Sequence, residues 1–209
     1  MIFLFFLACD LDSSSSTCSA YSQNSSDYGY CLYKHAERIE SITEIEEYCS
    51  HAGKWQQDCR QSWVQSKIDR YSLEELIGIC QQNTDCAFEV LDERPSEDLL
   101  IQIERCEAYA YRYFPECVSH ATWRWYYTDP SIKEMQRVSK ANLRSASFHV
   151  AEMIAARVQC SNVGSCEDAG RYAQQCKQNT GKFKEKSQCP NQRHLFEKKA
   201  AQRRERTNQ

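Results

Sequence analysis

Apolar residues recur every three or four positions over most of this chain, and that period predicts amphipathic α-helices. Two Ser-x-x-Glu sequences, Ser41 to Glu44 and Ser72 to Glu75, have the pattern of a capping box. In a capping box the hydroxyl and the carboxylate each accept a hydrogen bond from a backbone amide. We therefore expect one helix over residues 42–51 and another from residue 73 to about residue 80.

Glycine, proline and short polar runs divide the remaining chain into further predicted helices. Gly53 and residues 162–165 are typical of stops, whereas Pro115 suits the first turn of a helix. The other predicted helices cover residues 30–40, 54–71, 86–91 and 97–114, one starting at 115, one long helix over 131–158, and one over 167–178. Six glycines and four prolines are few for an all-β protein. The predicted fold class is all-α, a disulfide-rich helical bundle or stacked helical hairpins.

Thirteen of the 209 residues are cysteines, and their spacing argues for disulfides. No C-x-x-C sequence occurs, so zinc-binding, thioredoxin-like and c-type haem signatures are missing. So many thiols are usually oxidised in exported proteins and reduced in the cytosol. Twelve cysteines follow Cys9, an even number that allows six disulfides: Cys18, Cys31, Cys49, Cys59, Cys80, Cys86, Cys106, Cys117, Cys160, Cys166, Cys176 and Cys189.

The helix breaks restrict which cysteines can pair. Residues ten apart on one helix lie about 15 Å apart, whereas a disulfide needs Cα atoms within about 7 Å. Cys49 can therefore bond to Cys59 only because Gly53 ends the helix between them. Pairing in sequence order is compatible with these breaks: 18–31, 49–59, 80–86, 106–117, 160–166 and 176–189. Cross-links between neighbouring helices fit equally well.

The first residues resemble the end of a bacterial lipoprotein signal. An apolar run ends in Leu7-Ala8, directly before Cys9, and a Ser-rich stretch follows. The resemblance implies that Cys9 is diacylglycerylated and becomes the first residue of the mature protein. The short run has no preceding Lys or Arg, which a start codon placed too far downstream would explain.

Two other interpretations of the N-terminus remain open. A signal peptide cut after Ala20 would leave eleven cysteines, an odd number, and would place Asp10 and Asp12 inside the signal. An uncleaved apolar tip is the other, and seven apolar residues are too few to span a bilayer, which needs about 20.

The segment from Asp58 to Trp125 resembles uncharacterised cysteine-rich lipoproteins of predatory and fruiting δ-proteobacteria. The residues that carry this resemblance are Cys86 to Asp92, Arg94-Pro95, Asp98, Cys106, Cys117, His120-Ala121 and Arg124-Trp125. The resemblance implies an exported, membrane-anchored protein in the periplasm or at the cell surface, and it implies nothing about activity.

Charge is distributed unevenly along the chain. Residues 182–209 contain nine Lys or Arg and three Glu, which gives this segment a net charge of +6. Because the whole chain has a net charge of −3, residues 1–181 carry −9. We predict a leader over 1–8, a lipidated cysteine and Ser-rich tether over 9–27, a disulfide-stapled helical domain over 28–180, and a basic, partly disordered tail over 181–209.

No catalytic or ligand motif stands out, so we predict no catalytic residues, metal or cofactor. The five histidines form neither H-E-x-x-H nor H-x3-H, and no G-x-S-x-G, P-loop or G-x-G-x-x-G is present. His120 and Arg124, one helical turn apart, are the strongest candidates for a polar functional site. We interpret His120 as a hydrogen-bonded histidine at an interface.

Eight Tyr, Trp and Phe residues lie between residues 109 and 127. Most are expected in the core, and the candidate binding surface is His120, Trp123, Arg124, Trp125, Tyr126 and Tyr127. The preferred function is a non-enzymatic binding or structural module. Its partners would be the membrane, through the lipid, and an envelope protein or wall polymer, but not nucleic acid. The alternatives are an envelope hydrolase that cleaves wall saccharide with Glu or Asp, and a secreted eukaryotic protein.

Overall fold

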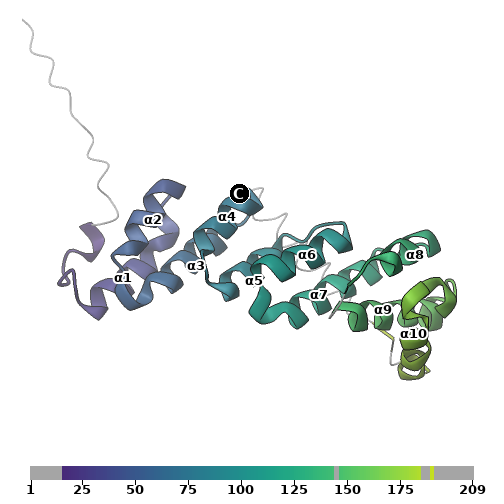
Figure 1. Cartoon of the computed structure of the whole chain (residues 1–209). Coiled ribbons are helices and arrows are strands. Elements are labelled where there is room, and N and C mark those ends of the chain that lie inside the picture. Colours follow the sequence, from purple (N-terminus) through teal and green to yellow (C-terminus); the bar gives the residue numbers. More distant parts are fainter. Residues whose placement is uncertain (1–15, 144–145, 185–188, 191–209) are drawn as a thin grey trace, which may run out of the picture. The chain divides into compact units, whose positions relative to one another are not determined.

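The computed structural model describes residues 16–143, 146–184 and 189–190, and in these ranges it contains helices and no strand (Figure 1). The predicted all-α, disulfide-rich fold class is confirmed. None of the helices built from these residues is long and apolar enough to cross a bilayer. The chain divides into two compact units, residues 1–86 and 87–209. The division falls inside the predicted 28–180 domain.

The first unit is built around α3 (Gln56–Ser66), which contacts α1 (Ser26–His35), α2 (Ile42–Ser50) and α4 (Leu73–Cys80) (Figure 1). Short 3-10 helices precede three of these elements: η1 (Ser16–Cys18), η2 (Ala36–Arg38) and η3 (Gly53–Trp55). Trp63 on α3 is fully buried, and its indole N–H donates to the carbonyl of Ile39 at 2.8 Å. This bond joins α3 to the segment that precedes α2.

Both predicted serine caps are present, with different geometry. Ser72 and Glu75 form the reciprocal capping box that starts α4. Ser41 also caps its helix, but its hydroxyl accepts from the amide of Thr43 at 3.3 Å. Cys18 is buried and bonded to Cys31, so the helical part of the chain begins inside the predicted 9–27 tether.

The second unit contains most of α5 (Thr84–Glu93), followed by α6 (Leu99–Tyr109), α7 (Phe114–Tyr127), α8 (Ile132–Lys140), α9 (Ser147–Ser161) and α10 (Ala173–Thr180). Among the described residues, the 3-10 helix η4 (Tyr111–Tyr113) connects α6 to α7, η6 (Cys166–Tyr172) connects α9 to α10, and η7 (Gly181–Phe183) follows α10. Helix α7 packs against α6 and α9, and α10 packs against α9 and η6.

The predicted helix over residues 131–158 is wrong, because the chain breaks between α8 and α9. The Tyr172 hydroxyl donates to the carbonyl of Ala141 at 2.8 Å and accepts from the amide of Leu143 at 3.2 Å. A side chain thus replaces the helical partners of these backbone groups. The predicted 97–114 helix also ends early, at Tyr109, and η4 follows.

All twelve cysteines after Cys9 are paired, four pairs in sequence order and two in another pattern. The pairs 160–166 and 176–189, which pairing in sequence order would give, are not formed, and Cys160–Cys189 and Cys166–Cys176 are formed instead. Helix α10 folds back on η6, which brings the Cα atoms of Cys166 and Cys176 within 5.5 Å. The leader, Cys9 and residues 191–209 of the predicted tail lie outside the described residues.

Candidate functional site

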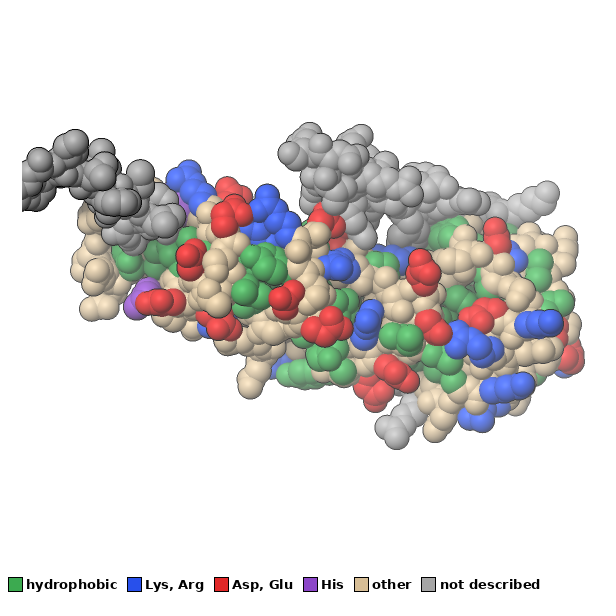
Figure 2. Space-filling view, turned by 90° about the horizontal axis from the view of Figure 1, so that it is seen from above, with side chains coloured by type: hydrophobic (Ala, Val, Ile, Leu, Met, Phe, Trp, Pro, Cys, Tyr) green, Lys and Arg blue, Asp and Glu red, His purple; other side chains and the backbone are tan. Residues whose placement is uncertain are grey.

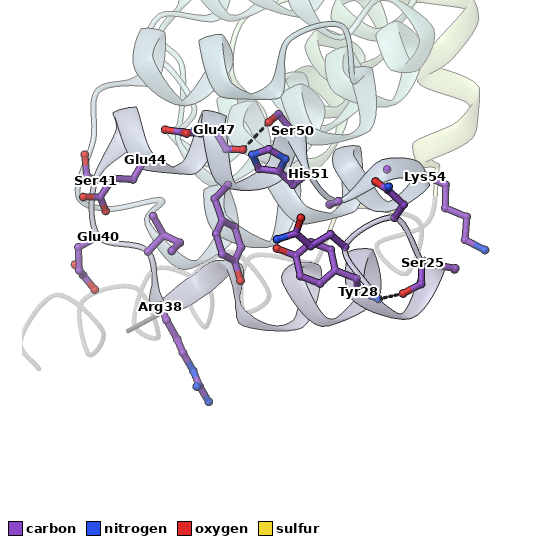
Figure 3. Close-up of a pocket in the computed structure, with 17 residues that line it drawn as sticks. Ser25, Tyr28, Arg38, Glu40, Ser41, Glu44, Glu47, Ser50, His51 and Lys54 are labelled. Carbon is purple, nitrogen blue, oxygen red and sulfur yellow. Dashed lines mark hydrogen bonds between the residues drawn. The ribbon is translucent and has the colours of Figure 1, made fainter. Parts of the chain in front are cut away.

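The first unit contains an open groove of about 1150 Å³ (Figure 3). Its walls come from the start of α1, from residues 38–44 with α2, and from the turn over residues 50–54. In Figure 3, Glu40 and Glu44 lie toward the left of the view and Lys54 toward the right, with Glu47 and His51 between them. Hydroxyl and amide side chains from residues 23–26 complete the lining.

All three carboxylates that line the groove come from one stretch, residues 40–47. Glu40 is held by Lys67 at 2.8 Å and Arg70 at 2.5 Å, and the bond and charge of Lys67 lower the pKa of Glu40. Glu44 and Glu47 lie one turn apart on α2. The lining therefore contains no pair of carboxylates that face each other across the groove.

The Tyr48 hydroxyl is a buried polar group of the groove lining with no hydrogen-bond partner among the described residues. Burial raises its pKa to about 12, with a further contribution from nearby Tyr28 that exceeds the opposing effect of Arg38. The hydroxyl is thus protonated at neutral pH and remains an unused donor.

A second polar cluster joins α5 to α7 in the second unit. Asp92 Oδ1 accepts from Arg124 Nη2 at 2.5 Å and from His120 Nδ1 at 2.7 Å, and Arg124 also donates to the Asp92 carbonyl at 2.7 Å. Burial alone would raise the pKa of Asp92. The hydrogen bonds and charges of His120 and Arg124 outweigh burial and hold that pKa well below its ordinary value.

The chemistry available to this cluster is limited. An ionised carboxylate can only accept, so Nδ1 of His120 carries the hydrogen. The His120 ring lies beside Phe88, which in turn stacks on Tyr113. No hydroxyl or thiol in the described part of the chain is hydrogen-bonded to His120. The described contacts therefore show a histidine that is oriented by a carboxylate and lies against an aromatic ring.

The six residues of the candidate binding surface fall into two groups. Trp125 and Tyr126 are buried, so they belong to the core, and Arg157 lies over the Tyr126 ring. His120 is exposed, and Trp123, Arg124 and Tyr127 are partly exposed. A pocket of about 210 Å³ beside Arg124 and Trp125 contains one carboxylate, Glu97.

Sequence reasoning brought His120 and Arg124 together but missed two features. Asp92 lies 28 residues before His120, and nothing in the local sequence distinguishes it from its acidic neighbours. An aromatic cluster of Tyr30, Tyr33 and Trp55 was also missed, because its members come from α1 and η3. Their spacing in the sequence gives no sign of contact.

Surface charge and metal ligands add no further site. Acidic, basic and hydrophobic side chains alternate over the described residues of the face in Figure 2, without an extended region of one sign. The described residues contain no group of three His, Cys, Asp or Glu arranged to hold a metal ion. No family model, curated protein or solved structure matches this chain.

Proposed function

We propose that this protein is an exported lipoprotein, anchored to the membrane through Cys9, whose helical units bind a partner in the cell envelope. The observation that carries the proposal is the pairing of the twelve later cysteines with one another. Thirteen cysteines are present, so Cys9 has no cysteine of the chain left to bond. Six disulfides support an oxidising compartment.

The groove of the first unit supports a binding role. Its lining contains the hydroxyl and amide side chains of residues 23–26, and such groups can hydrogen-bond to a saccharide or to a peptide backbone. Hydrolysis of a glycoside needs two carboxylates that flank the scissile bond. The groove carboxylates all come from one wall, so no observation favours the hydrolase alternative.

The experiment is the intact mass of the protein extracted from the membranes of its host, without reduction, before and after thiol alkylation. A chain that begins at Cys9, carries a diacylglyceryl group and takes up no alkylating reagent is the expected result. Reactive thiols, or a chain without lipid, would contradict the proposal.

The matched control is Cys9→Ser, expressed in the same host. This variant should lose the lipid and leave the membrane fraction, and its twelve other cysteines should still resist alkylation. A Cys9→Ser protein that stays in the membrane fraction in high salt would show that another feature anchors the chain.

A further inference from the structure

Three aromatic rings meet at the surface of the first unit, where α1 contacts η3. The Trp55 ring lies 5.2 Å from Tyr30, edge to face, and 5.9 Å from Tyr33, nearly parallel. Tyr30 is 44% exposed, and the other two rings are partly exposed. We call these residues, together with Lys34 and Lys54, the aromatic–lysine face.

The two lysines lie over these rings rather than beside acids. Lys34 Nζ is 5.4 Å from the Tyr30 ring centre and 5.1 Å from that of Tyr33, and Lys54 Nζ is 5.4 Å from that of Trp55. Neither lysine forms an ion pair with any residue that the structure describes. Their positive charges are therefore available to an anionic partner.

This combination of side chains suits the boundary between a bilayer and water. Tyrosine and tryptophan are enriched there, because each ring has an apolar body and a polar edge. Lysine places its aliphatic stem along apolar surface and its ammonium among headgroups, and each lysine near an anionic surface adds attraction.

The distance along the chain from Cys9 supports the same partner. Tyr30 is adjacent to Cys31, which is bonded to Cys18, and Cys18 lies only nine positions after Cys9. Nine positions along a chain span at most about 30 Å. A lipid on Cys9 therefore keeps the aromatic–lysine face within reach of the bilayer.

We propose that the aromatic–lysine face rests on the headgroup layer of the membrane that holds the Cys9 lipid, with the lysines against anionic phospholipid. This inference rests on the proposed lipid anchor. The unit would then be docked on the bilayer instead of moving freely on its tether. Docking would fix which surfaces of the unit face away from the membrane.

The test places the lipidated protein in vesicles of phosphatidylcholine and phosphatidylglycerol that contain brominated phospholipid, which quenches nearby tryptophan. We expect quenching that is lost in Trp55→Phe and retained in Trp123→Phe. Lys34→Gln with Lys54→Gln should reduce it, whereas Lys133→Gln with Lys140→Gln, two exposed lysines of α8, should not.

The outcomes separate the two proposals. Docking would be overturned if quenching persisted in Trp55→Phe. It would also be overturned if lipidated protein, identified by its mass, showed no quenching, and in both cases the lipid anchor would stand. Protein without lipid would refute the anchor by mass alone, before any vesicle is added. A change in Trp55 emission caused by soluble wall polysaccharide, without quenching in vesicles, would overturn the membrane as partner and assign a saccharide to the face.

Discussion

Replacing Asp92 with asparagine should destabilise the protein, because the change removes the charge that joins α5 to α7. Asp92 is 10% exposed, and its Oδ1 accepts from both Arg124 and His120. Arg124 is only 17% exposed, so the variant leaves a largely buried guanidinium without this carboxylate. The loss should appear in the free energy of unfolding.

Its magnitude follows from the burial of the two bonds. A hydrogen bond to a charged group contributes about 1.5–3 kcal/mol net when it is largely buried, whereas an exposed ion pair contributes less than about 1 kcal/mol. The Arg124 bond belongs to the first class, and the His120 bond belongs to the second because that ring is 47% exposed. Asparagine keeps an oxygen that can accept from Arg124, so we expect a loss of about 2 kcal/mol.

The loss should also depend on pH. The folded-state pKa of Asp92 is lowered, so its stabilisation is complete above the unfolded pKa, near about 4, and is lost as the pH falls through the folded pKa. The difference in unfolding free energy between wild type and Asp92→Asn should therefore be full at about pH 7 and narrow below about pH 4.

Equilibrium unfolding in urea, without reductant and at several pH values, measures both effects. Glu107→Gln is the matched control, because it removes one carboxylate charge from an exposed position on α6 of the same unit. We expect the control to change the free energy of unfolding by less than about 0.5 kcal/mol. Equal losses in the two variants at neutral pH would refute the role of the cluster. A difference that persists unchanged in acid would assign the loss to packing instead of charge.

Three further predictions use other features of the structure. Tryptic digestion without reduction should release peptide 158–171 bonded to both 172–177 and 187–193, whereas pairing in sequence order would give 158–171 an internal disulfide. Tyr48→Phe should leave the free energy of unfolding unchanged or raise it, because the Tyr48 hydroxyl has no hydrogen-bond partner among the described residues. Tyr172→Phe should lower the free energy of unfolding by about 1–3 kcal/mol, because the Leu143 amide loses its acceptor. Urea unfolding compares the two variants, and an equal loss in both would contradict the absence of a partner at Tyr48. Ser72→Ala should lower the free energy of unfolding by about 1 kcal/mol through loss of the α4 cap, and a change near zero would show that the cap is not needed.

Features encoded within a few residues could be predicted from the sequence. The serines at 41 and 72 cap helices as expected, because an N-cap depends only on the next three residues. Pro115 lies in the first turn of α7, where its missing N–H is of no consequence. The four local disulfides in sequence order are compatible with the same short-range breaks, but those breaks did not select them over cross-links between neighbouring helices.

Features that depend on distant residues could not be predicted. The break between α8 and α9 relies on Tyr172, whose hydroxyl reaches back about thirty residues to Ala141 and Leu143. The sequence over 131–158 keeps its helical period through that point, so periodicity alone predicts a continuous helix. The partner of His120 was missed for the same reason, because only side-chain contacts formed in the folded chain bring Asp92 of α5 to His120 of α7.

The positions of the disulfides explain how such short helices remain folded. Isolated helices shorter than about 12–15 residues are marginal in water, and the α-helices here have 8 to 15 residues. Every described α-helix except α8 contains one cysteine, and five of the six disulfides join residues only 6 to 13 positions apart. The bonds therefore hold successive helices together as hairpins. Helix α8 depends on other contacts, because it packs on η6 and its Arg137 reaches Asp98 at 3.0 Å. Local cross-linking of this kind therefore stabilises helices that would be marginal on their own.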